Sequence, residues 1–89
     1  MTAKMQRRPT HPGEILLEEF LKPKNITQRA AAEAMKISLN RLNEIIKGKR
    51  GVTAETALRL AAFVGTTPEF WLNLQNAVDL YEARRAMVA

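Results

Sequence analysis

None of the 89 residues is cysteine, and no apolar run is long enough to cross a bilayer. The lack of cysteine excludes a disulfide framework, a thiol nucleophile and a zinc–thiolate site. With a single histidine there is also no histidine cluster to hold a metal, so we expect neither a metal nor a cofactor. Residues 1–9 carry three basic side chains but lack the apolar segment of a signal peptide, so we expect a cytoplasmic protein.

Groups typical of catalysis are also scarce. Glu14, Glu18 and Glu19 fall on the first predicted helix without a nucleophile or a pocket, so we interpret them as solvated surface. We expect His11 to be a structural residue near the start of that helix rather than a base or a ligand. The spacing of the glycines does not fit a phosphate-binding loop. The sequence therefore predicts a protein that is not an enzyme.

What the chain does contain is an ordinary globular composition with an uneven distribution of charge. Hydrophobic residues make up 46% and charged residues 26%, which fits one small domain. The net charge is +5, but residues 1–50 hold eleven Lys and Arg against five Glu, whereas residues 51–89 are nearly neutral. A basic balance can simply keep a protein soluble. Its concentration in one half instead favours a polyanionic partner bound to that half.

Capping residues and apolar periodicity predict an all-α fold of five helices. The first begins at Pro12 and stops at Pro23, and the second and third occupy residues 28–35 and 39–47. The fourth ends at Gly65, and the fifth runs from Pro68 towards residue 85 as an extended C-terminal helix. The predicted N-caps of helices two to five are Thr27, Ser38, Thr53 and Thr67. We expect residues 1–9 to be a disordered tail and residues 10–89 to be a single domain.

Residues 27–46 have the layout of a helix-turn-helix, two short helices joined by a turn of about three residues. Ala31 supplies the small residue for close helix approach, Ile37 fills the turn, and Leu42 and Ile45 hold the third helix in the core. The other face of the third helix is polar. The agreement of spacing, turn and charge favours a DNA-reading face over an ordinary solvated one.

The polar side chains near this helix match particular DNA groups. The asparagines suit adenine edges, Arg41 suits guanine or a phosphate, and Glu44 suits a cytosine amine. Gln28, at the start of the second helix, and the basic residues after the third suit the phosphate backbone. The predicted DNA-binding set is Gln28, Ser38, Leu39, Asn40, Arg41, Asn43, Glu44, Lys47, Lys49 and Arg50.

The fifth helix is apolar around more of its circumference than one buried face requires. We expect Trp71 to lie in the core. A self-complementary contact with a second copy of the chain accounts for the remaining apolar surface. The predicted dimer interface consists of Leu74, Val78 and Tyr81.

Residues 27–64 resemble the lambda-repressor-like, or Xre, family of helix-turn-helix domains. The resemblance rests on Thr27 and Gln28, on residues 38–42 (SLNRL) and on residues 45–50 (IIKGKR). Further blocks resemble the HigA antitoxins and extend the similarity over about residues 10–85. These blocks are residues 11–14 (HPGE), 20–21 (FL), 48–53 (GKRGVT), 57–60 (ALRL), 70–75 (FWLNLQ) and 79–80 (DL).

Two positions depart from the family pattern. Lys36 stands where the turn usually has glycine, so we expect a bulky residue in a nearly left-handed conformation, with modest strain or an altered turn. Leu39 stands where the family more often has a polar residue that faces bases. It either contacts a thymine methyl group or packs against its neighbours.

The resemblance implies an antitoxin of a type II toxin–antitoxin system. Such a protein neutralises a HigB-type, RelE-like toxin that cleaves mRNA, and it represses its own operon by binding a palindromic operator as a dimer. One alternative is a stand-alone Xre-family regulator without a toxin partner. Another is a protein-interaction module that has lost DNA binding. A neighbouring reading frame for a small basic toxin distinguishes the first from the second, and alanine substitution of Asn40 and Arg41 tests the third.

Overall fold

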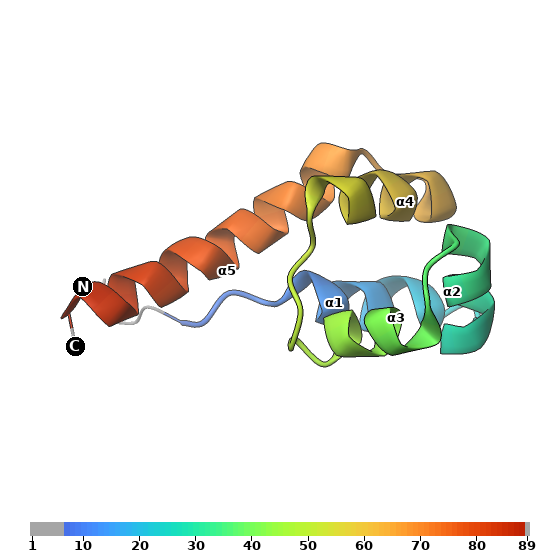
Figure 1. The fold of residues 1–89 in the computed structure, drawn as a ribbon, viewed down its shortest axis with the longest axis horizontal. Helices are drawn as coiled ribbons and strands as arrows, with labels where there is room; N and C mark the ends of the chain where they lie inside the picture. The colour runs from blue at the N-terminus through green and yellow to red at the C-terminus, as the bar shows by residue number, and fades with distance from the viewer. Residues whose placement is uncertain (1–6, 89) are drawn as a thin grey trace.

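The computed structural model describes residues 7–88, and within them the only regular elements are helices (Figure 1). The predicted all-α fold is therefore confirmed. None of the described helices combines the length and the apolar character needed to span a membrane. The helices are α1 (Pro12–Ile15), η1 (Leu16–Leu21), α2 (Gln28–Met35), α3 (Leu39–Ile46), α4 (Ala54–Val64) and α5 (Pro68–Val88).

The first predicted helix is present as two consecutive segments, α1 and the wider π-helical η1. The backbone N–H of Lys22 donates to the carbonyl of Leu17, five residues earlier, at 2.9 Å. The helix ends before Pro23, as predicted. The imidazole Nδ1 of His11 accepts a hydrogen bond from the backbone N–H of Gly13 at 2.9 Å. His11 is thus the N-cap of α1, which is the structural role expected for it.

The other helices begin where their capping residues predict. Thr27, Ser38 and Thr53 each accept a hydrogen bond from the backbone N–H three residues later, at 3.0, 3.0 and 3.3 Å. Thr67 does the same at the start of α5, at 3.1 Å. Each of these bonds satisfies a donor that the first turn of a helix leaves free.

The core lies between α4, the first half of α5 and the helices of the N-terminal half. Trp71 is fully buried, as predicted, and its ring packs against Phe20 and Phe70 with centroid distances of 5.7 and 5.0 Å. The indole N–H donates to Thr66 Oγ1 at 2.7 Å, so burial leaves no unpaired donor. The other large core side chains are Leu16, Leu21, Leu42, Ile45 and Leu60.

Gly13 allows α1 to lie directly against α3. A Cβ atom at this position would stand 1.9 Å from the carbonyl oxygen of Ile45, which is closer than any real Cβ contact. Only glycine therefore permits this approach. Because Ile45 belongs to the predicted DNA-reading helix, α1 fixes the depth at which that helix sits in the domain.

The distal half of α5, residues 79–88, extends beyond the body of the domain (Figure 1). The N-terminal segment, residues 7–11, runs towards it. Arg8 forms an ion pair with Glu82, and its guanidinium lies 5.7 Å from the centre of the Tyr81 ring. Residues 1–6 of the predicted disordered tail lie outside the described residues. Residues 7–9 belong to the described structure, and Arg8 contacts α5 there.

Candidate nucleic-acid interface

Helices α2 and α3 form the predicted helix-turn-helix around the turn that begins at Lys36. Lys36 has φ 60° and ψ 42°, the left-handed conformation expected for it. This conformation costs a non-glycine residue roughly 1–2 kcal/mol. The backbone N–H of Ile37 donates to the carbonyl of Ala32 at 3.0 Å, which closes the end of α2. Ala31 is fully buried, as its role in close helix approach requires.

Four predicted residues form one surface across α2 and α3. The four are Gln28, Leu39, Asn40 and Asn43. Together with Arg29 they line a shallow pocket. The side-chain amide of Asn43 donates to Gln28 Oε1 at 3.2 Å, so the two helices present a connected pair of amides. Leu39 is 37% exposed and Asn40 is exposed, which leaves both available to an external partner.

Arg41 lies on the same helix but its guanidinium contacts α4. Its Nη2 atom donates to Thr56 Oγ1 at 2.6 Å and to Glu55 Oε1 at 3.0 Å. The second carboxylate oxygen of Glu55 accepts from Arg59 Nε, also at 3.0 Å. Hydrogen bonds from Arg41 and then Arg59 hold the pKa of Glu55 below its usual value. Arg41 is therefore engaged within the protein, whereas the sequence predicted a contact with guanine or phosphate.

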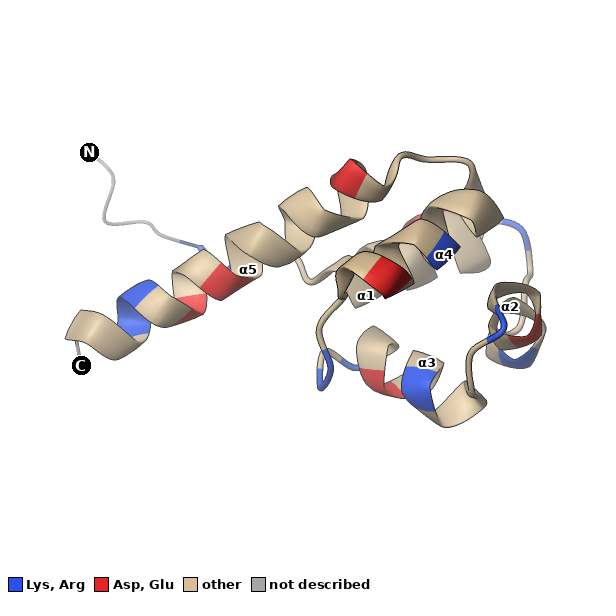
Figure 2. Cartoon of the chain, turned by 45° about the horizontal axis from the view of Figure 1, so that its top comes forward, with Lys and Arg blue, Asp and Glu red and all other residues tan. Residues whose placement is uncertain are grey.

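Glu44 and Arg50 are likewise engaged with each other. Arg50 Nε and Nη2 lie 2.9 and 2.7 Å from Glu44 Oε1. The backbone N–H of Lys49 also donates to the Glu44 carbonyl, at 2.9 Å, which folds the basic loop, residues 47–51, onto the end of α3. Within residues 7–88, Lys47 and Lys49 have no ion pair and are exposed. Figure 2 shows both signs of charge along α3. Ser38 is exposed, and its hydroxyl caps α3.

Residues Glu55, Thr56 and Arg59 belong to this site but were not predicted from the sequence. Thr56 is 2% exposed, and Arg59 Nη1 donates to the carbonyl of Met35 at the end of α2, at 3.1 Å. Their positions in α4 show no spacing signal that pairs them with α2 or α3. The partners lie 14 to 24 residues apart in the chain, so only the folded structure brings them together.

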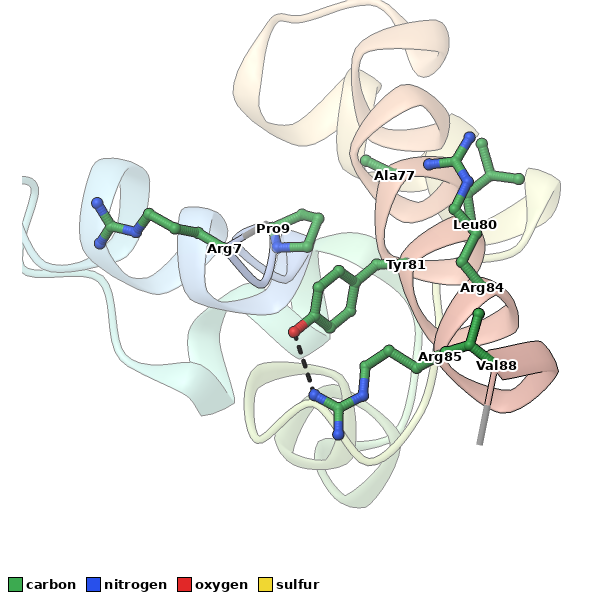
Figure 3. Close-up of a pocket in the computed structure, with 8 residues that line it drawn as sticks. All are labelled: Arg7, Pro9, Ala77, Leu80, Tyr81, Arg84, Arg85 and Val88. Carbon is green, nitrogen blue, oxygen red and sulfur yellow. Dashed lines mark hydrogen bonds between the residues drawn. The ribbon is translucent and has the colours of Figure 1, made fainter. Parts of the chain in front are cut away.

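The residues predicted for a dimer interface occupy different environments. Val78 is only 5% exposed, and the half-buried Leu74 packs against the core. Both side chains thus pack mainly within the protomer. Tyr81 lies at an apolar hollow on the distal half of α5 (Figure 3). Leu80 and Val88 line the same hollow and are 44% and 84% exposed. The other lining residues are Arg7, Pro9, Ala77, Arg84 and Arg85.

Comparison with known proteins places this geometry among helix-turn-helix proteins. Residues 17–71 match the helix-turn-helix family. Antitoxin HigA-1 of Vibrio cholerae serotype O1 is 52% identical over 82 residues, which cover 91% of this chain and 76% of that protein. The HTH-type transcriptional regulator YbaQ of Escherichia coli K12, itself uncharacterized, is 44% identical over 81 residues, which cover 91% of this chain and 72% of that one.

A solved structure with DNA is also similar. It is the Pseudomonas aeruginosa antitoxin HigA with the higBA promoter, and it superposes with a TM-score of 0.85 at 43% sequence identity. The match covers 89% of this chain and 86% of that one. The shared fold thus extends over most of this chain.

Proposed function

The chain belongs to the Xre-like helix-turn-helix family and to its HigA type, and on this premise we propose that it is an antitoxin and autorepressor. The family consists of DNA-binding regulators and antitoxins rather than enzymes, in agreement with the sequence. The protein binds a palindromic operator in its own promoter as a homodimer in the cytoplasm. It neutralises a HigB-type, RelE-like toxin that cleaves mRNA.

The surface shared by α2 and α3 carries the DNA-binding part of the proposal. Asn40 and Asn43 each offer a donor and an acceptor, the pattern that pairs with the N6 and N7 atoms of adenine in the major groove. Leu39 offers an exposed apolar group for a thymine methyl. Gln28 begins α2 beside them, where a phosphate can also accept hydrogen bonds from the helix N-terminus. These four residues read the operator and set its register.

The basic loop supplies attraction to any DNA. Lys47 and Lys49 are exposed and contact phosphates, together with the hydroxyl of Ser38. Arg41 and Arg50 are partly neutralised by Glu55 and Glu44, so each contributes less than a free arginine to phosphate attraction. We therefore expect a shallower salt dependence of binding than the number of basic residues indicates.

The dimer forms through the distal half of α5. Asp79 and Glu82 precede Arg84 and Arg85 on this segment. Two copies packed antiparallel can place the acidic residues of one helix beside the basic residues of the other, and the two-fold axis makes each such contact occur twice. The exposed apolar side chains Leu80 and Val88, together with Tyr81, then form the centre of the interface. Val78 and Leu74 pack within the protomer, so they hold α5 in place beneath this interface rather than contact the second copy.

A stand-alone regulator without a toxin is the second candidate, and the similarity to YbaQ favours it. It has the same DNA chemistry and the same dimer. The two functions differ in one partner. Co-purification of the tagged protein with the product of its neighbouring reading frame tests this difference. A stable complex with a small basic protein supports the antitoxin, and its absence leaves the regulator.

The DNA-binding part is tested by gel shift on the upstream promoter and on random DNA of equal length, at several salt concentrations. Asn40→Ala should lower affinity for the operator only, by about tenfold, because a lost base contact relaxes specificity. Lys49→Ala should weaken binding to both DNAs about equally and reduce the salt slope by about one. Equal losses on both DNAs for the two variants would contradict the assignment of these roles.

A further inference from the structure

We propose that Glu55 is the positioning residue that sets the orientation of the DNA-reading helix, an inference that rests on the proposed DNA binding. One carboxylate joins three helices. Its Oε1 atom accepts from Arg41 on α3, and its Oε2 atom accepts from Arg59 on α4, both at 3.0 Å. Arg59 in turn donates to the carbonyl of Met35, the last residue of α2. Glu55 is thus linked to both helices of the helix-turn-helix.

A buried hydroxyl strengthens the connection to α3. Thr56 is the one polar side chain that is buried among residues 7–88, and its Oγ1 accepts from Arg41 at 2.6 Å. The same oxygen lies 3.2 Å from the hydroxyl of Thr53, which caps α4. Guanidinium is planar and rigid, so acceptors on two adjacent residues fix its direction as well as its position. Arg41 is therefore held against the first turn of α4.

The polar contact of Arg41 gives α3 a directional restraint that its apolar contacts do not provide. Leu42 and Ile45 bury one side of a helix of only eight residues, but apolar burial has no preferred direction. A hydrogen-bonded guanidinium does have one, and it restricts rotation of α3 about its own axis. Asn40 and Asn43 flank Arg41 on this helix, so the same contact determines where their amides point.

The positioning role and a simple charge effect predict opposite signs. If Glu55 acted only as a negative charge near the phosphates, Glu55→Gln would raise affinity for every DNA. If it positions α3, the same substitution lowers affinity for the operator, which needs aligned amides. Affinity for random DNA, which needs only phosphate contacts, does not fall with it.

The experiment measures dissociation constants for an operator duplex and a scrambled duplex of equal length, at one salt concentration. Glu55→Gln should lower the operator-to-random affinity ratio by about twofold to fivefold. Glu69→Gln is the matched control. Glu69 is also the second residue of its helix and is exposed, and it has no ion pair within the described part of the chain. Its substitution should leave the ratio unchanged.

Two further measurements separate positioning from a loss of folding. Glu55→Asp keeps the charge on a shorter side chain and should recover part of the ratio. Thermal melting shows whether each variant is folded at the assay temperature, and the NMR signal of the Arg41 side-chain N–H reports whether the contact persists. An unchanged ratio in Glu55→Gln, or equal changes on both DNAs, would overturn the inference. A wild-type protein without preference for the operator would overturn the proposed function itself.

Discussion

The two halves of α5 carry similar apolar side chains but meet different surroundings. In the first half Trp71 is fully buried, and its ring packs against Phe20 of η1 and Phe70. In the second half Leu80 and Val88 are 44% and 84% exposed, although they belong to the same continuous helix. The distal half extends past the body of the domain, and among the described residues Arg8 of the N-terminal segment contacts it (Figure 1).

This difference shows that the apolar content of a helix does not by itself define a core. What distinguishes the two halves is the set of segments opposite each one. The first half packs against α4 and α1 and contributes to the free energy of folding. The second half leaves apolar surface exposed, and the proposed dimer would bury that surface. The two halves should therefore respond differently to substitution.

The largest effect is expected for Trp71→Ala in the buried half. Removal of a fully buried aromatic side chain costs about 3–5 kcal/mol through lost transfer free energy and the cavity that remains. It also leaves the hydroxyl of Thr66 without the indole donor. Because domains of this size have stabilities of about 5–15 kcal/mol, we expect a large loss of structure at 37 °C. Urea unfolding followed by far-UV circular dichroism measures the change.

Leu58→Ala is the control for this prediction. Leu58 lies on α4 and is 60% exposed, so its truncation should change the free energy of unfolding by less than about 1 kcal/mol. A similar loss of stability in both variants would mean that burial in the body of the domain does not distinguish these positions.

The next effect concerns the contact between α1 and α3. Gly13→Ala places a methyl group 1.9 Å from the Ile45 carbonyl oxygen, so the helices must move apart. Overpacking of this kind costs roughly 1–3 kcal/mol or more. We expect operator affinity to fall as well, since α3 moves. Gly65→Ala separates the two effects, because it meets no atom within 4 Å and is disfavoured only by its φ of 83°. It should change stability without changing the relative affinity for operator DNA.

Gly13 also illustrates what the sequence could not predict. The N-caps Thr27, Ser38 and Thr53 and the left-handed Lys36 were predicted correctly, because each depends on neighbours within a few residues. The need for glycine at position 13 depends on Ile45, which lies 32 positions further along the chain. No local pattern reports that two helices meet at this point.

The same limit applies to the candidate site. The helix-turn-helix and the exposed amide surface follow from helical periodicity, which separates the polar face of α3 from Leu42 and Ile45. The ion pairs of Arg41 and Arg50 do not follow from it. Long flexible side chains reach acceptors that lie 14 and 6 residues away in sequence, and several carboxylates compete for them. Periodicity predicts the helix face that carries an arginine, but it does not predict which acceptor atom the guanidinium contacts.

In the distal half of α5, Leu80→Glu should weaken the proposed dimer and leave the protomer folded. A charge at the centre of the apolar contact should raise the dimer dissociation constant by about tenfold or more, and operator affinity should fall with it. Sedimentation velocity across a concentration series measures the change. Leu58→Glu places the same charge on an exposed leucine outside α5. If it dissociates the dimer equally well, the interface lies elsewhere.

The smallest effect is a pH dependence at the junction between the N-terminal segment and the body. Partial burial, and then the charge of Arg8, lower the pKa of His11 below its usual value near 6.5. The unfolded chain therefore binds a proton more readily than the folded one. The cap should contribute its full stability above about pH 6.5 and lose it as the pH falls through the folded pKa.

His11→Asn tests this dependence, because asparagine retains an N-cap acceptor but does not titrate. Melting temperatures at pH 7.5 and pH 5.5 should differ more for the wild type than for the variant, since only the wild type loses the hydrogen bond to the Gly13 N–H on protonation. Equal differences would mean that the titration of His11 does not cause the acid sensitivity. A wild-type protein that gains stability towards pH 5.5 would contradict the sign of the shift, because a lowered histidine pKa destabilises the folded state only on the acid side.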